Sequence, residues 1–368
     1  MRRGPSCSNT CRLVSLGVAA FSLFAATTSD AEEFSAERVE LVVPFTEGGG
    51  TDLYARYFAR VLGPALPGAP GIAVVNMPGG GSIVGANNFE ARGDEDGSSI
   101  LAVSTATHTA FTFRDESGKV RYDPSKWIAI IGSPLGAVNV IRADTGVATI
   151  ADLATLGEKE VVLGIQGATG SSLLTLLSFE LLGLNVRPVF GVDGGAASIS
   201  LERGEVQIHT YYASNYASAG QPLVDSGIAV PLFSFGYLDE AGKVARDPNF
   251  PDVPSFVEAY EQVHGKAPSG PEFDAWMALF QAVVMNSKAL VLPATAAPEV
   301  VQAYREAMAQ VVEDPGFAEE AAPFIGGYPQ SLGEAAQDSL ESGSDFSPEV
   351  QTWIRNWLQQ YGATLSPT

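Results

Sequence analysis

Cysteine and histidine are both scarce in this chain. The only cysteines are Cys7 and Cys11, close to the N-terminus, and the histidines are His108, His209 and His264. No two histidines are spaced i, i+4, so the sequence gives no reason to expect a metal site, and we expect no cofactor. After residue 31 the chain has no cysteine, so apolar packing alone must hold its core together.

The motifs of several enzyme classes are also missing. The sequence contains no G-x-x-x-x-G-K-[ST], no G-x-G-x-x-G after a strand and no G-x-S-x-G. Nucleotide binding and the common hydrolase elbow are therefore not expected, and we expect a protein that is not an enzyme. One alternative stays open, namely an exported hydrolase that uses His108 or His209 with a nearby serine, because Ser–His sites differ widely in sequence position.

Positive charge is in short supply. The formal net charge is −21, and the chain has 42 acidic residues against 21 Lys and Arg. Nucleic acid and anionic membranes would be repelled by such a surface, so we expect neither as a partner. A small anion remains possible as a ligand, because backbone N–H groups can bind negative charge without basic side chains.

The N-terminal residues have the order of features found in secretory signals. Arg2 and Arg3 come first, an apolar run covers 13–26, and Ser29-Asp30-Ala31 offers small residues where a signal peptidase cuts. We predict a signal peptide over 1–31 that is cleaved near Ala31 and directs the protein to the periplasm. No later apolar run is long enough to cross a bilayer.

Strands and helices alternate after the signal. In the first region the predicted strands are 39–45, 72–76 and 99–103, and the predicted helices are 52–62 and 83–91. In the second region the predicted strands are 138–141, 160–164, 186–190 and 206–209, the predicted helices are 173–182 and 196–203, and 229–233 leads back to the first region. Helices are predicted over 298–312 and 347–361. This alternation is typical of an α/β fold with parallel sheets covered on both faces.

Two glycine-rich loops precede helix starts, one in each region. They cover 48–52 and 167–172. Unpaired N–H groups and a partial positive charge occur at the start of a helix, and glycine lets a ligand approach that backbone closely. The hydroxyl groups of Thr51, Thr169, Ser171 and Ser172 add donors. The pair of loops indicates an anion site, although each loop alone could be an ordinary capped turn.

Several segments, in order, resemble one known family, the substrate-binding proteins of tripartite tricarboxylate transporters (TctC/Bug). The segments are Leu41-Val42-Val43-Pro44-Phe45, Gly48-Gly49-Gly50-Thr51-Asp52, Asn76-Met77-Pro78-Gly79-Gly80-Gly81, Tyr122-Asp123-Pro124 and Phe250-Pro251-Asp252-Val253-Pro254. The resemblance implies a two-lobed periplasmic binding protein fold (Venus-flytrap, type II-like) with two crossovers. We expect lobe 1 to comprise 32–135 and 232–368, and lobe 2 to comprise 136–231.

The resemblance also implies a function and a set of ligand-binding residues. The protein would be a monomer that captures a small carboxylate, such as a di- or tricarboxylate, between its lobes and delivers it to the membrane subunits of a tripartite transporter. By analogy with the family, the ligand would be held by Phe45, Gly49, Gly50, Thr51, Asp52, Ser104, Thr105, Ala168, Thr169, Gly170 and Ser171. Departures occur at Leu173, where the family often has histidine, and at Tyr211, near a position that is commonly acidic.

Overall fold

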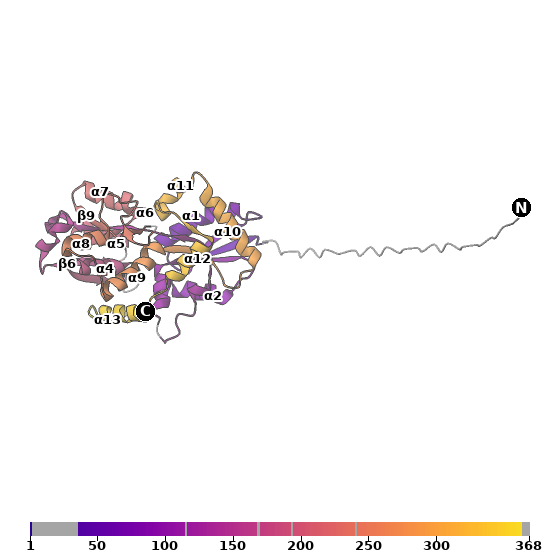
Figure 1. Ribbon diagram of the computed structural model, residues 1–368, viewed down its shortest axis with the longest axis horizontal. Coiled ribbons are helices and arrows are strands. Elements are labelled where there is room, and N and C mark those ends of the chain that lie inside the picture. The colour runs from indigo at the N-terminus through magenta and orange to yellow at the C-terminus, as the bar shows by residue number, and fades with distance from the viewer. Residues whose placement is uncertain (2–35, 115, 168–169, 193, 240, 363–368) are drawn as a thin grey trace. The chain divides into compact units, whose positions relative to one another are not determined.

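The computed structural model describes Met1 and residues 36–114, 116–167, 170–192, 194–239 and 241–362 (Figure 1). The chain divides into two units, 1–32 and 33–368. The predicted signal segment lies outside the described residues apart from Met1, and so do Ala168 and Thr169. All that follows concerns the second unit.

A six-stranded sheet is built mainly from the first part of the chain. Its strands are β1 (Arg38–Val43), β2 (Gly71–Asn76), β3 (Ser99–Ser104), β4 (Ile128–Ser133), β12 (Lys288–Leu292) and β13 (Ser331–Leu332). They lie in the order β13-β4-β12-β3-β1-β2. Strands β2, β1 and β3 are parallel, as predicted, but β12 runs antiparallel to both β3 and β4. The expectation of a wholly parallel sheet is therefore wrong, because the chain leaves this sheet after β4, passes through the five-stranded sheet, and returns as β12 in the opposite direction.

Helices cover both faces of this sheet. They are α1 (Gly50–Ala65), α2 (Ile83–Arg92), α3 (Thr105–Thr112), α10 (Pro298–Glu313), α11 (Phe317–Ile325) and α12 (Gly333–Ser342). Leu41, Val42 and Val43 are consecutive and all fully buried, which explains why β1 reads as an unbroken apolar run. Tyr54 and Phe58, one turn apart on α1, pack on one side of the sheet.

A five-stranded sheet follows in the middle of the chain. Its strands are β5 (Ala137–Arg142), β6 (Glu160–Ile165), β7 (Asn185–Phe190), β8 (Ile208–Tyr212) and β9 (Ala229–Ser234), in the order β7-β6-β8-β5-β9. Strands β7, β6 and β8 are parallel, whereas β5 is antiparallel to β8 and β9. The segment 229–233, predicted to lead back to the first region, is instead an edge strand of this sheet. The expected lobe boundary between 231 and 232 falls inside β9.

Helices from two separate parts of the chain surround the five-stranded sheet. They are α4 (Ser172–Leu181), α5 (Gly194–Arg203), α6 (Ala213–Asn215), α7 (Gln221–Asp225), α8 (Phe256–His264), α9 (Pro271–Phe280) and α13 (Pro348–Gln359) (Figure 1). A single apolar core joins Leu176 of α4 with Phe256, Trp276 and Trp357. Helices α8, α9 and α13 thus share the core of the second sheet, although the sequence placed 232–368 with the first.

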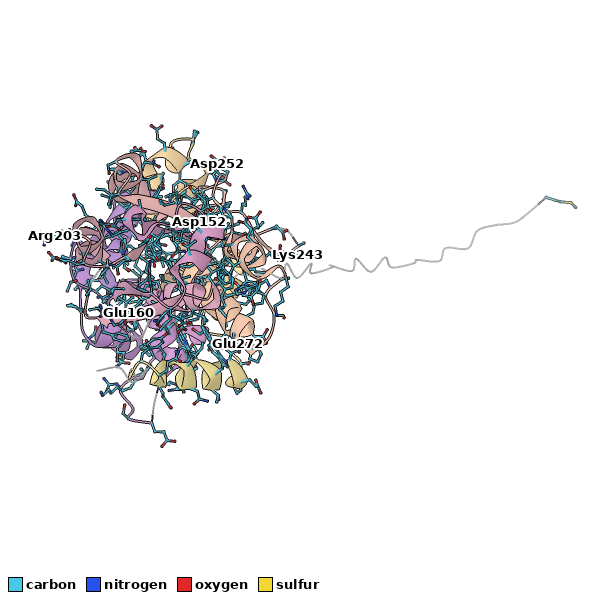
Figure 2. The ribbon with its side chains drawn as sticks, turned by 90° about the vertical axis from the view of Figure 1, so that its left-hand side faces the viewer. Asp152, Glu160, Arg203, Lys243, Asp252 and Glu272 are labelled. Carbon is cyan, nitrogen blue, oxygen red and sulfur yellow. The ribbon has the colours of Figure 1, made fainter. Side chains whose placement is uncertain are left out.

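Two crossovers connect the sheets, the first at 134–136 and the second between β9 and β12. The chain therefore has the α/β fold with two sheets and two crossovers that the sequence predicted. Many charged side chains lie on the surface, and Figure 2 shows Asp152, Glu160 and Lys243 among those of the part that includes the five-stranded sheet. Among the described residues, no helix is both long and apolar enough to cross a membrane.

Candidate ligand-binding site

The first glycine loop ends at the start of α1. Gly49 is the N-cap residue, and no side chain caps the helix. Within the described part of the chain, no acceptor is found for the N–H groups of Gly50, Thr51 and Asp52, whereas Leu53 N–H bonds the Gly49 carbonyl. Gly49 and Gly50 are exposed. These free donors, together with the positive end of a 16-residue helix, can bind an anion.

A cluster of side chains holds this loop in shape. The buried Asp52 carboxylate accepts hydrogen bonds from Gly48 N at 2.9 Å, Arg56 Nε at 2.9 Å and Asn76 Nδ2 at 2.9 Å. Asn76 Nδ2 also donates to the Phe45 carbonyl at 3.0 Å. Burial raises the pKa of Asp52, but these hydrogen bonds outweigh burial and leave the pKa lowered. Asp52 is therefore ionised, and its carboxylate oxygens are already hydrogen-bonded. Through these bonds it holds the loop in shape rather than facing a ligand.

Lys288, which no sequence pattern singled out, lies directly beneath the loop. Its Nζ donates a 3.1 Å hydrogen bond to the Gly50 carbonyl and lies 5.4 Å from the centre of the Tyr54 ring. The side chain is buried, and burial lowers the pKa of Lys288 to about 8. The predicted anion site had no basic side chain, whereas the structure places an ammonium group beside it. Residue 288 is far from the loop in sequence, so only the position of β12 reveals it.

Ser104 ends β3 and lies beside Lys288 in the sheet, and Thr105 begins α3. Ser104 pairs with Lys288 in register, and its N–H bonds Thr107 Oγ1 at 3.3 Å. Thr105 donates its hydroxyl to the Ala282 carbonyl at 3.1 Å and its N–H to the Ser287 carbonyl at 3.2 Å. The polar groups of Thr105 therefore attach α3 to the segment that precedes β12. Phe45 is half-buried against the core of the first sheet.

The described part of the second glycine loop is more constrained than the first. Gly170 is buried at φ +78°, a conformation that favours glycine, and its N–H donates to Thr109 Oγ1 at 3.3 Å. The Gly170 N–H group is thus already paired. Ser171 is half-buried and hydrogen-bonds with the Tyr212 side chain. Burial raises the pKa of Tyr212, and the contact with Ser171 offsets only part of that rise. Through Thr109 on α3, this loop connects to the end of β3.

The two histidines of the hydrolase alternative are both buried, and burial lowers the pKa of each to about 4. His108 Nδ1 lies 2.7 Å from Ser344 Oγ, so this histidine does meet a serine. In the described residues, however, no carboxylate bonds its other ring nitrogen, which lies against Gly343. His209 packs edge-on against Tyr211 with ring centres 4.6 Å apart. In the part of the chain that the structure describes, neither histidine is hydrogen-bonded to the orienting acid of a Ser–His–Asp site.

A separate cavity of about 510 Å³ lies away from the glycine loops, near the end of α3. It is lined by Phe111, Thr112, Arg114, Glu116, Ser344, Gln351 and Arg355. None of the predicted ligand-binding residues lines it. Among the described residues, no group of three His, Cys, Asp or Glu side chains could hold a metal ion.

Comparisons with known proteins agree with the motifs. No family model matches the chain. Protein BugT of Bordetella pertussis is 33% identical over 98 residues, which cover 25% of this chain and 29% of BugT, so the match spans less than a third of that relative.

Solved structures extend the similarity to most of the chain. A TctC solute-binding protein from Polaromonas is similar with a TM-score of 0.61 and 20% identity over 88% of this chain and 98% of its own. An R. palustris protein with adipate has a TM-score of 0.62 and 19% identity over 89% of this chain and 98% of its own. These likenesses show that the chain shares the α/β fold of both proteins, and the first of them is described as a solute-binding protein. The chain is therefore similar to BugT in one stretch of its sequence, and over most of its length it is similar in fold to the TctC solute-binding protein.

Proposed function

We propose that this protein is a periplasmic solute-binding protein that captures a small carboxylate between two lobes. The observation that carries the proposal is the first turn of α1, where the N–H groups of Gly50, Thr51 and Asp52 have no acceptor among the described residues. An ionised carboxylate would supply acceptors for these donors and would gain from the helix dipole. The bound adipate of one structural relative supports this ligand class.

The lobes of this proposal follow the two sheets. The six-stranded sheet with α1, α2, α10, α11 and α12 would form one lobe, and the five-stranded sheet with α4, α5, α8, α9 and α13 the other. The ligand site would combine Phe45, 49–52, Ser104 and Thr105 with 168–171 of the second lobe. The protein would act as a monomer and deliver its ligand to the membrane subunits of a tripartite tricarboxylate transporter.

Calorimetry with adipate tests the capture function directly. Wild-type protein, stripped of bound ligand by unfolding and refolding, should bind adipate at one site, and native mass spectrometry of untreated protein should reveal a co-purified organic acid. Small-angle scattering should show a smaller radius of gyration with ligand, because a ligand that contacts both lobes stabilises the closed state. A folded protein that binds no di- or tricarboxylate and carries none from the cell would contradict the proposal.

Export is tested separately from binding. Intact-mass measurement of protein from a periplasmic fraction should give a chain that begins near Glu32. Full-length chain that stays with the membrane would contradict the predicted cleavage near Ala31.

A further inference from the structure

Lys288 occupies a buried position at the centre of the first sheet. It begins β12, with Ser104 of β3 on one side and Ser133 of β4 on the other. Only 8% of the residue is exposed. A Cβ atom on Gly50 would lie 3.7 Å from Lys288 Nζ, so the ammonium is next to the exposed first residue of α1.

The charge of Lys288 has no counter-ion in the described residues. Among the described residues its Nζ, which has three N–H donors, makes one hydrogen bond, to the Gly50 carbonyl, and no carboxylate lies within ion-pair distance. Asp52, the acid on the adjacent helix, is already paired with Arg56. By contrast, Lys243 is exposed on the surface, where water solvates its charge (Figure 2). A buried cation without an anion is costly, and such groups are usually paired.

We propose that Lys288 is a ligand-binding residue whose ammonium pairs with the carboxylate received by the first turn of α1, and that it makes the site select an ionised carboxylate over a neutral group of the same shape. This inference rests on the proposed capture function. The ligand would then meet three free N–H groups and one cation at the same place. Neutral amides would meet an uncompensated charge and would bind poorly.

The groups that face Lys288 define how binding should depend on pH. On α1 this group is Tyr54, whose ring centre lies 5.4 Å from Nζ and whose pKa is raised by burial, whereas Asp52 of the same helix is paired with Arg56. β3 and β4 contribute Ser104 and Ser133 beside it in register, which do not titrate. Without ligand, the pKa of Lys288 is about 8, so at pH 9 much of it is neutral. A ligand carboxylate favours the ammonium and raises this pKa, so binding above pH 8 should take up a proton.

The experiment compares wild type with Lys288→Met, Lys288→Arg and the exposed-lysine control Lys243→Met. Adipate binding is measured by calorimetry at pH 9 in two buffers of different ionisation enthalpy, which gives the number of protons taken up. Adipamide, the uncharged analogue, is titrated in parallel. Circular dichroism and the melting temperature show whether each variant is folded.

We expect proton uptake in wild type and in Lys243→Met, and none in Lys288→Met. At pH 7 Lys288→Met should bind adipate about ten- to a hundredfold more weakly, since a charge-assisted contact is lost. It should also discriminate less between adipate and adipamide. Lys288→Arg keeps a charge that does not titrate, so it should bind adipate more tightly than Lys288→Met and take up no proton.

Two results would overturn the inference, and they differ from failure of the capture function. Folded Lys288→Met that binds adipate like wild type, with the same proton uptake, would show that the ammonium does not meet the ligand. Wild-type binding of adipamide as tight as that of adipate would show that the site does not select charge. Wild type that binds no carboxylate at all would overturn the capture function itself, and the inference with it.

Discussion

The two glycine loops look alike in sequence but differ in how their backbone donors are used. In the first loop, the side chains of Asp52 and Asn76 hold the backbone in shape, and the N–H groups at the start of α1 find no acceptor among the described residues. In the second loop, the N–H of Gly170 is bonded to Thr109 in a buried contact. Glycine content alone therefore does not tell whether a loop presents its donors or uses them for packing.

This difference assigns different tasks to the two loops. The first is pre-organised, with a cation beneath it, and it can receive a charged group without rearranging. The second is attached to α3, which begins where β3 ends, so its position depends on a helix of the first sheet. The first loop should therefore determine affinity for the carboxylate, and the second should determine how the two sheets are coupled.

The largest expected effect is that of Gly50→Asp in the first loop. The Cβ of the new side chain would lie 3.7 Å from Lys288 Nζ, so its carboxylate can pair with the ammonium and occupy the ligand's place. Losing two charge-assisted contacts should weaken adipate binding about a hundredfold or more by calorimetry.

Gly50→Ala is the matched control for that change. A Cβ at position 50 meets only the lysine tip at an ordinary contact distance, and no positive φ requires glycine there. The alanine variant should therefore keep its fold and most of its affinity. Wild-type affinity in a folded Gly50→Asp protein would place the carboxylate elsewhere and remove the distinction between the loops.

The next effect concerns stability and pH. The pKa of Lys288 is about 8 in the folded chain against 10.5 for an unperturbed lysine, so the unfolded chain binds more protons between these values. The cost of the buried charge is present below pH 8 and disappears as the pH rises toward 10.5. Lys288→Met should remove that cost and stabilise the ligand-free protein by at most about 3 kcal/mol at pH 7.

Urea unfolding at pH 7 and pH 10 measures this effect. The advantage of Lys288→Met over wild type should shrink as the pH rises, while Lys243→Met should follow wild type at both values. An advantage of equal size at both pH values would mean that packing of the methionine, not removal of a charge, explains the stability.

Much of the α/β arrangement is predictable because buried strands leave an apolar signature. β3 was predicted over 99–103 and is found at Ser99–Ser104, and α2 was predicted over 83–91 and is found at Ile83–Arg92. The placement of β9 and β12 was not predictable in the same way. Their neighbours in the sheets are strands from distant parts of the chain, and a local sequence pattern does not predict which distant strands will pair.

The candidate site shows the same division. Its glycine loops could be located from sequence, because glycine and helix-start residues follow strands at a recognisable spacing. The occupation of Gly170 N–H by Thr109, and the approach of Lys288 to Gly50, depend on tertiary contacts across 61 and 238 residues. A single lysine in an apolar strand was the one available signal, since Lys288 begins a strand whose five residues are all buried.

A smaller effect is expected for Asn76→Ala, which tests whether the first loop is pre-organised. The change removes a donor to Asp52 and a donor to the Phe45 carbonyl. Stability should fall by about 1–2 kcal/mol, and adipate should bind about tenfold more weakly because the loop must now be ordered on binding. The exposed Asn88 on α2 supplies the control, Asn88→Ala, which should change neither quantity. If stability fell but adipate affinity did not change, the hydrogen bonds of Asn76 would support the fold without positioning the N–H groups at the start of α1.

The smallest effect on binding is expected for Thr109→Val in the second loop. Valine has the shape of threonine without the hydroxyl, so the buried Gly170 N–H loses its acceptor while packing is kept. Stability should fall by about 1–2 kcal/mol, and adipate binding should weaken only about threefold, since the donors of the first loop are untouched. Thr112→Val is the matched control. It removes a hydroxyl on the same helix, one that donates to the Ser344 carbonyl, and it should leave adipate affinity unchanged. Calorimetry and urea unfolding of both variants separate the two roles. If Thr109→Val weakened binding as much as Gly50→Asp while remaining folded, the second loop would contribute as much to the carboxylate contact as the first.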